Sequence, residues 1–227
     1  MKRVVYIIRL DDANCNFNRY SNKKMISELF VRYMACSLLK MDNSRLSFSK
    51  NAYGKPYLVG FPNFHYNISY TKCTIVIGFS DKPIGVDVEN IRAIDIKIAK
   101  RFFSKNELDY VLSNDESSQK LFCEIWAKKE AYVKWNGKGL SMAFSSFDVT
   151  DNRIGEILSL FKVDDYIISI CSEKNFGCKE IVELNEHQAS QISAEFIDFL
   201  VRNNYRSFSW ILQWLWESSL VVKAKIE

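Results

Sequence analysis

The apolar and polar positions of the first half predict strands around one long helix. Residues 3–9 are almost continuously apolar, which predicts a strand. Between residues 23 and 39 the apolar positions recur at helical spacing, which predicts an amphipathic helix. Short apolar runs bounded by turn residues predict further strands over 65–70, 73–79 and 84–89. The expected order is therefore strand, helix, strands.

The second half predicts three helices. One follows Asp95, a second begins at Ser104, and a long third helix follows a polar loop at 113–119 and ends at Gly137. A glutamate, Glu107, lies three residues after Ser104, which is the spacing of a capping box. We therefore interpret Glu107 as a helix-capping residue.

Strands should follow these helices over 145–150, 154–161 and 166–171. Because a helix followed by strands occurs in both halves, we predict an α+β fold of two similar α/β subdomains in a pseudo-twofold arrangement. The expected boundaries are 1–83 for the N-terminal subdomain, 84–180 for the C-terminal subdomain and 181–227 for a helical C-terminal tail. The aromatic end of that tail either packs on the body or binds a partner.

Composition and charge exclude several classes of function. The chain has 227 residues with 31 basic and 27 acidic side chains, a net charge of +4, and no dense basic stripe, so we expect no nucleic-acid binding. No apolar run is long enough for a membrane span or a signal peptide, so we expect a cytoplasmic protein. We interpret the six cysteines as free thiols, although Cys171 and Cys178 could pair. The two histidines lie far apart, so a metal would be held by oxygen.

The first candidate site is the segment from Ile84 to Glu89. Strict alternation places Gly85, Asp87 and Glu89 on one face of the expected strand. Carboxylates two residues apart on a strand can converge on one hard cation such as Mg²⁺. The alternative is an ordinary half-buried strand with a solvated acidic face.

The second candidate lies on the long helix. Trp126, Glu130 and Lys134 follow one another at i, i+4 and i+8, along nearly one line of the helix. Taken alone, Glu130 and Lys134 fit an exposed ion pair, and Trp126 fits a packing residue. Together with the acidic strand and the Gly137-Lys138-Gly139 turn, however, they predict a site for Mg²⁺ and phosphate.

These segments carry a specific resemblance. Gly85-Val86-Asp87-Val88-Glu89 followed by the Trp126 to Lys134 pattern resembles the paired motifs of 4′-phosphopantetheinyl transferases. Further motifs similar to that family are Gly54-Lys55-Pro56, Asn67-Ile68-Ser69, Arg101 to Glu107 and Gly137 to Ser141. Their order and spacing resemble the larger, monomeric group that activates surfactin synthetase, the Sfp type, over about residues 20 to 172.

The resemblance implies transfer of the 4′-phosphopantetheine arm of coenzyme A to a serine of an acyl, peptidyl or aryl carrier protein, in nonribosomal peptide or polyketide biosynthesis. It also implies that Asp87, Glu89 and Glu130 hold Mg²⁺. Glu130 would take the serine proton, directly or through a bound water. Lys134 would neutralise or protonate the departing phosphate, and Lys129 would stabilise charge on the pyrophosphate.

The same resemblance assigns residues to coenzyme A. Lys55 and Ser69 match family positions, whereas Tyr70 stands where the family typically has a histidine against the 3′-phosphate. Lys23 and Lys24 lie in the first turn of the expected helix, where the helix dipole disfavours cations, so a bound phosphate would explain them. Chance placement would explain them equally well.

Two alternatives remain at this stage. One is a non-catalytic module that binds coenzyme A or a carrier protein on the same fold, which the replacement at Tyr70 favours. The other is an unrelated Mg²⁺-dependent phosphohydrolase that uses the same carboxylates, but it would leave the remaining motifs unexplained.

Overall fold

The computed structural model describes residues 3–10, 20–92, 95–113 and 117–184, and it confirms the α+β class. The strands and helices in chain order are β1 (Val4–Arg9), α2 (Tyr20–Leu39), β2 (Phe48–Lys50), β3 (Pro56–Leu58), β4 (His65–Tyr70), β5 (Thr74–Ser80), β6 (Ile84–Asn90), α3 (Ile96–Phe102), α4 (Lys105–Leu112), α5 (Ser118–Asn136), α6 (Asn152–Gly155), β7 (Leu158–Val163), β8 (Tyr166–Ser172) and β9 (Ile181–Leu184). Among the described residues, no helix is long and apolar enough to cross a membrane.

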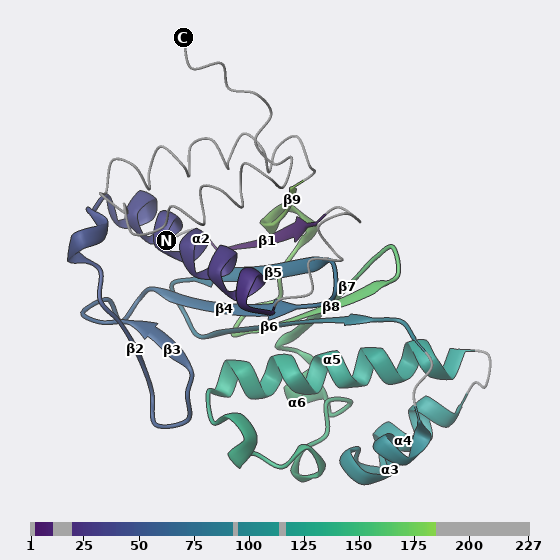
Figure 1. Ribbon diagram of the computed structural model, residues 1–227. Helices are drawn as coiled ribbons and strands as arrows, with labels where there is room; N and C mark the ends of the chain where they lie inside the picture. The colour runs from purple at the N-terminus through teal and green to yellow at the C-terminus, as the bar shows by residue number, and fades with distance from the viewer. Residues whose placement is uncertain (1–2, 11–19, 93–94, 114–116, 185–227) are drawn as a thin grey trace. The chain divides into compact units, whose positions relative to one another are not determined.

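The strands form three sheets (Figure 1). One has the order β4-β5-β1-β9, the second is the β2-β3 hairpin, and the third has the order β6-β8-β7. Strand β8 pairs antiparallel with β6 on one side and with β7 on the other. The third sheet thereby brings together β6, which carries two of the expected site carboxylates, and two strands that lie about 80 residues further along the chain.

The chain divides into two compact units. The larger unit consists of Met1–Val5, Phe48–Thr71 and Val76–Ile181, and the other of Tyr6–Ser47, Lys72–Ile75 and Val182–Glu227. The expected subdomain boundaries and pseudo-twofold arrangement stay predictions. The helices expected after Glu186 lie outside the described residues. All of the site geometry below belongs to the larger unit.

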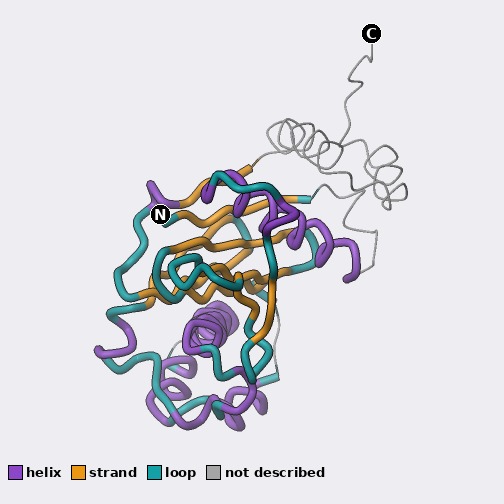
Figure 2. The backbone as a smooth tube through the Cα atoms, turned by 90° about the vertical axis from the view of Figure 1, so that its left-hand side faces the viewer, coloured by secondary structure: helices purple, strands orange, loops and turns teal. Residues whose placement is uncertain are grey.

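Helix α5 lies directly on the β6-β8-β7 sheet, and Figure 2 shows it nearly end-on beside the strands. Gly85 makes this approach possible. A Cβ atom at Gly85 would come within 2.0 Å of the Ala131 carbonyl oxygen and 2.4 Å of the Trp135 backbone nitrogen. Real Cβ atoms do not approach backbone this closely, so only glycine fits where the helix crosses the strand. The face of β6 that carries Gly85 is therefore the face that meets α5.

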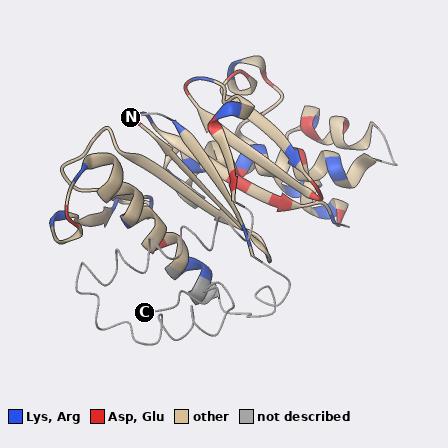
Figure 3. Cartoon of the chain, turned by 90° about the horizontal axis from the view of Figure 1, so that it is seen from above, with Lys and Arg blue, Asp and Glu red and all other residues tan. Residues whose placement is uncertain are grey.

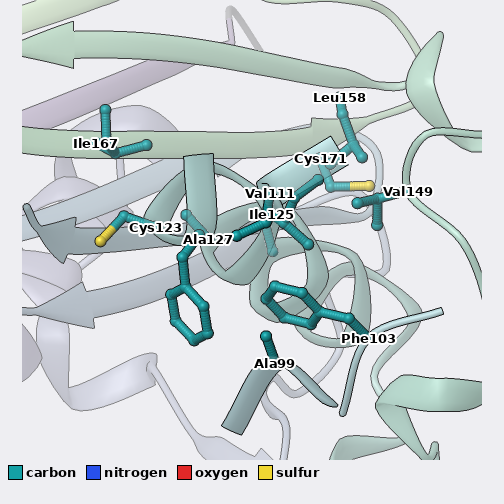
Figure 4. Close-up of a cluster of buried hydrophobic side chains, with 12 residues drawn as sticks. Ala99, Phe103, Val111, Cys123, Ile125, Ala127, Val149, Leu158, Ile167 and Cys171 are labelled. Atoms are coloured by element: carbon teal, nitrogen blue, oxygen red, sulfur yellow. The ribbon is translucent and has the colours of Figure 1, made fainter. Parts of the chain in front are cut away.

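A hydrophobic cluster joins α5 to the sheet and to the two shorter helices (Figure 4). Ile125, Ala127 and Ala131 of α5 contribute to it together with Ile167 and Cys171 of β8, and all of them are buried. The two alanines suit a helix that lies close to a strand, because larger side chains would push the backbones apart. This cluster fixes the rotation of α5 and thus the direction in which its polar side chains point.

Trp126 of α5 lies in an aromatic group that packs against this cluster. Its ring stacks on Phe122 with centroids 5.7 Å apart, and it packs edge-on against Phe102 at 5.8 Å. Phe144 is a further neighbour at 5.3 Å. These contacts confirm the interpretation of Trp126 as a packing residue.

A buried ion pair joins α4 to α5. The Lys129 ammonium lies 2.8 Å from a Glu107 carboxylate oxygen, and neither side chain is exposed to solvent. Lys129 also donates to the carbonyl oxygens of Phe144 at 2.6 Å and Phe147 at 2.7 Å. Burial lowers the pKa of Lys129, and the hydrogen bond to Glu107 opposes that shift. The lysine is thus held by several acceptors, as a buried charge requires.

Glu107 forms the expected capping box with Ser104. The Ser104 backbone nitrogen donates to Glu107 Oε2 at 2.7 Å, and the Glu107 nitrogen donates to Ser104 Oγ at 3.2 Å. The second carboxylate oxygen, Oε1, accepts from the Val149 nitrogen at 2.7 Å. Glu107 therefore ties the start of α4 both to α5 and to the segment after it.

The strand expected over 145–150 is absent, and that prediction is wrong. A short 3₁₀ helix, η4 (Phe144–Ser146), begins there and is followed by a turn. Side chains use the backbone donors that a strand would need, because Val149 donates to Glu107 and Thr150 donates to Asp148 at 2.8 Å. The strand expected over 154–161 begins only at Leu158, since Asp151 caps the short helix α6 first.

The cysteines differ in part from the expectation. Cys36, Cys123, Cys171 and Cys178 are free, so Cys171 and Cys178 do not pair. Cys73, in contrast, is disulfide-bonded, and the expectation of six free thiols is wrong at that position. Disulfides depend on the distance between cysteines in space, which their spacing along the chain does not reveal.

Replacing Gly85 tests the packing of α5 on β6. Gly85→Ala should lower the free energy of unfolding by about 3 kcal/mol, because the added methyl overlaps helix backbone that cannot move aside. Urea denaturation measures this change. Gly155→Ala is the matched control, since the nearest atom to its added Cβ is 3.8 Å away. Equal stability of the two variants would contradict the packing described for Gly85.

Candidate functional site

Strand β6 and helix α5 bring four of the expected site residues together. Asp87 and Glu89 follow Gly85 at alternate positions, so they share the face of β6 that meets α5. Glu130 and Lys134 lie one turn apart on α5. The Lys134 ammonium reaches Asp87 Oδ1 at 2.6 Å. Figure 3 colours Asp and Glu red and Lys and Arg blue along the described chain.

Asp87 is the most constrained of these side chains. It is 4% exposed, and Oδ1 accepts a hydrogen bond from Ser69 Oγ at 2.8 Å in addition to the one from Lys134. Lys134 also donates to Ser69 Oγ at 3.1 Å, which closes a three-membered network. The second oxygen, Asp87 Oδ2, is buried and has no hydrogen-bond partner. One oxygen is thus fully used, and the other remains available to a ligand.

Strand β4 holds this network in place through side chains. Asn67 Oδ1 accepts from the Val86 backbone nitrogen at 2.8 Å, and Ser69 Oγ accepts from the Val88 nitrogen at 3.4 Å. Two side chains that are two residues apart on β4 therefore bind two alternate amides of β6. This pairing sets the register between β4 and β6, and it places the Ser69 hydroxyl beside Asp87.

Glu89 and Glu130 hold their protons more tightly than carboxyl groups in water. The pKa of Glu89 is raised to about 7, first by burial and then by the negative charge of Asp87. Burial also raises the pKa of Glu130, and Asp87 adds to that rise while Lys134 opposes it. Buried carboxylates that share one sign of charge show this behaviour. A bound cation would reverse it, because positive charge favours the ionised forms.

The donor set fits a hard divalent cation. It consists of carboxylate oxygens and a hydroxyl, which Mg²⁺ and similar ions prefer. Asp87 Oδ2 is the buried atom in need of such a partner. Among the described residues, no group of three His, Cys, Asp or Glu side chains is already gathered closely enough to count as a metal centre. A cation bound at Asp87 would therefore need Glu89 and Glu130 to move closer to it, or it would need further ligands from a bound molecule.

Lys55, expected to contact coenzyme A, binds backbone carbonyls. Its ammonium donates to the oxygens of Lys134 at 2.6 Å, Trp135 at 3.1 Å and Ile84 at 3.1 Å. Burial lowers the pKa of Lys55 to about 8. Two of the three acceptors belong to the last turn of α5, where carbonyls lack helical partners. A phosphate at this lysine would have to compete with them.

Asn51, which the sequence did not single out, supports the same end of α5. Its Nδ2 donates to the Gly137 oxygen at 2.9 Å, while its Oδ1 accepts from the nitrogens of Tyr53 and Lys55, both at 2.9 Å. The side chain thus orders the β2-β3 turn and binds it to the helix end. An Asn followed by Gly54 is a turn signal that could have revealed the first role, whereas nothing in the sequence indicates the second.

The remaining expected residues lie elsewhere. Lys129 points to Glu107 in the buried pair described above. Tyr70 is half-buried at the end of β4. Helix α2 begins at Tyr20, so the expected helix start at Lys23 is wrong, and Lys23 and Lys24 are its fourth and fifth residues in the other unit. Burial and Lys72 lower the pKa of Lys23. Contacts of all four with coenzyme A stay predictions.

The segment that carries this site is similar to one known family. A family model described as the 4′-phosphopantetheinyl transferase superfamily matches residues 83–192. The matched segment contains Asp87, Glu89, Glu130 and Lys134, the residues that β6 and α5 bring together.

Several curated proteins are similar to the chain. The 4′-phosphopantetheinyl transferase Sfp of Bacillus subtilis (strain 168) is 35% identical over 138 residues, which are 60% of this chain and 62% of that protein. The 4′-phosphopantetheinyl transferase gsp of Aneurinibacillus migulanus is 38% identical over 148 residues, 63% of this chain and 62% of that protein. The 4′-phosphopantetheinyl transferase psf-1 of Bacillus pumilus is 29% identical over 71% of this chain and 75% of that protein.

The similarity to Sfp and gsp spans about three fifths of the length of those proteins. The segment that matches the family model, 83–192, contains both the strand and the helix that form the acidic site. Residues 83–192, which carry this strand and helix, are therefore similar to the 4′-phosphopantetheinyl transferase superfamily.

Proposed function

We propose that the chain transfers the 4′-phosphopantetheine arm of coenzyme A to a serine hydroxyl of an acyl, peptidyl or aryl carrier protein. The serine oxygen forms a bond to the phosphorus that bears the pantetheine, and the bond from that phosphorus to adenosine 3′,5′-bisphosphate breaks. By resemblance to the Sfp type, the enzyme is a cytoplasmic monomer that serves nonribosomal peptide or polyketide biosynthesis.

The observation that carries this proposal is the arrangement around Asp87. Its Oδ1 is bound by Ser69 and Lys134, its Oδ2 is buried without a partner, and Glu89 and Glu130 have raised pKa values beside it. Such a group suits a Mg²⁺ ion that takes part of its ligands from a pyrophosphate. We assign Asp87, Glu89 and Glu130 to that ion. When bound, Mg²⁺ supplies positive charge that offsets the charge of the pyrophosphate.

Glu130 is the residue proposed to take the serine proton. The ionised carboxylate of Glu130 can accept that proton directly or through a bound water. Neither β6 nor α5 contains a histidine, so no imidazole on these two elements competes with Glu130 for the role of base. Its position one turn from Lys134 places a base and an ammonium together on one face of the helix.

Lys134 is proposed to neutralise or protonate the departing phosphate. Its ammonium now pairs with Asp87 Oδ1. If Asp87 also held a cation, Lys134 would share that carboxylate and would have more of its charge free for a phosphate. The same side chain can thereby serve as a counter-charge before substrate binds and as a phosphate ligand afterwards.

For coenzyme A we propose contacts from Lys55, Ser69, Tyr70 and Lys129, together with Lys23 and Lys24. A tyrosine hydroxyl can donate a hydrogen bond to a phosphate but supplies no positive charge at neutral pH. This difference at Tyr70 favours the second candidate function, a module that binds coenzyme A or a carrier protein without catalysis. The assay below separates the two.

Incubation with coenzyme A, Mg²⁺ and an apo carrier protein tests the activity. Mass spectrometry of the carrier should show the gain of one phosphopantetheine, and Glu130→Gln should slow this reaction by about 10²- to 10⁴-fold because it removes the base. Glu124→Gln, on the same helix but paired with Lys120, is the matched control and should retain activity. Coenzyme A binding without modification of several carriers would favour the binding module instead.

The raised pKa of Glu89 predicts how pH affects stability. Between the ordinary pKa of 4.5 and about 7 the folded protein binds a proton that the unfolded chain releases, so this residue stabilises the fold at low pH and loses that effect as pH rises through 7. Without metal, Glu89→Gln should therefore melt at a higher temperature than the unsubstituted protein at pH 8, with little difference at pH 5. Thermal denaturation at the two pH values measures this difference in melting temperature.

The exposed Glu173 provides the control for that experiment. Glu173→Gln should show no such dependence on pH, because its carboxylate lies in solvent. Added Mg²⁺ should raise the melting temperature of the unsubstituted protein more at pH 8 than at pH 5. The difference in melting temperature between Glu89→Gln and the unsubstituted protein should change with pH. A difference that is the same at pH 5 and pH 8 would contradict the electrostatics of this site.

A further inference from the structure

Ser169 lies directly opposite Asp87 in the sheet. The two residues are Cα partners in the antiparallel pairing of β6 with β8. Side chains of directly opposed residues project from the same face of a sheet, with Cβ atoms roughly 5 Å apart. The Ser169 side chain is therefore on the face of the sheet that meets α5, beside the carboxylate of Asp87.

The Ser169 hydroxyl is buried and has no hydrogen-bond partner. The side chain is 0% exposed, and it lies between Ile167 and Cys171 on an otherwise apolar face of β8. Two other buried serines of this sheet are both satisfied: Ser159 Oγ accepts from the Phe176 nitrogen at 2.8 Å, and Ser172 donates to the Lys174 carbonyl oxygen. Ser169 thus differs from its neighbours, and burying a hydroxyl without a partner is costly.

Two unpartnered buried oxygens therefore occupy one cross-strand pair, Asp87 Oδ2 and Ser169 Oγ. The other Asp87 oxygen is already bound by Ser69 from β4, on the opposite edge of β6. Asp87 thus has a serine on each side, and only Ser69 on β4 forms a hydrogen bond with it. A ligand between Asp87 and Ser169 would satisfy both remaining oxygens at once.

We propose that Ser169 is a further residue of the cation site, and that its hydroxyl binds a water of the cation's hydration shell beside Asp87 Oδ2. This inference rests on the proposed function, since it uses the Mg²⁺ assigned there. Mg²⁺ keeps several of its waters when it binds proteins. Protein groups that hydrogen-bond to the ligands of a metal affect the affinity of the site for that metal. Ser169 is a positioning residue in this role, because it acts through the water.

A Mn²⁺ titration of the full chain, followed by electron paramagnetic resonance without coenzyme A or carrier, tests the proposal. Ser169→Ala should raise the Mn²⁺ dissociation constant about tenfold, within the range seen when outer ligands are removed. Its melting temperature without metal should be unchanged or higher, because the substitution removes a buried hydroxyl that has no partner in the protein.

Ser159→Ala is the matched control on the neighbouring strand. It removes the acceptor of the Phe176 nitrogen, so its melting temperature should fall while its Mn²⁺ affinity stays unchanged. The two variants should thus separate: one loses metal affinity without loss of stability, and the other loses stability without loss of metal affinity. If Ser169 only contributed to stability, its replacement would not lower the affinity for Mn²⁺ while leaving the melting temperature unchanged.

Two outcomes would overturn the inference, and they differ in what they say of the function. If the unsubstituted protein binds Mn²⁺ and Ser169→Ala binds it equally well, Ser169 is no part of the site, while the proposed transferase stands. If the unsubstituted protein binds no Mn²⁺ and also fails to modify carrier proteins, the inference falls together with the proposed function.

Discussion

Helix α5 lies so close to strand β6 that their backbones meet at Gly85, where a single methyl group would overlap the helix. The rest of the site depends on this contact. Asp87 and Glu89 follow on the same face of β6, and Lys134 of α5 can reach Asp87 only because the helix is held at this distance. The glycine of the Gly-Val-Asp-Val-Glu segment therefore has a steric role, and the acidic residues that follow it form the proposed cation site.

Three further groups of contacts keep α5 in place. The Lys129–Glu107 pair joins its middle to α4, the ring of Trp126 packs on Phe102 of α3, and Lys55 with Asn51 binds its C-terminal end. Strand β4 does the same for β6 through Asn67 and Ser69. Charged and polar side chains of the family motifs thus build the frame that positions Asp87, Glu130 and Lys134.

Much of the fold and of the acidic site could be predicted from the sequence, because periodicity and capping are local properties. Strand β6 and the end of α5 at Gly137 follow from alternation and from a C-terminal glycine, and Glu107 was correctly interpreted as a cap. The contacts of Lys55 and Lys129 could not be foreseen, since a lysine that binds carbonyls and one that binds phosphate look the same in a motif. Ser169 shows the same limit: only the pairing of β8 with β6 brings it beside Asp87.

The central claim is that Asp87, held through Oδ1 by Ser69 and Lys134, presents Oδ2 to a cation. A crystal structure of the full chain with Mn²⁺ and coenzyme A, with the metal located by its anomalous scattering, tests this most directly. The account predicts a peak at coordination distance from Asp87 Oδ2, near Glu89 and Glu130. A peak that lies away from Asp87, or one that replaces Ser69 at Oδ1 while Oδ2 stays unbound, would contradict it.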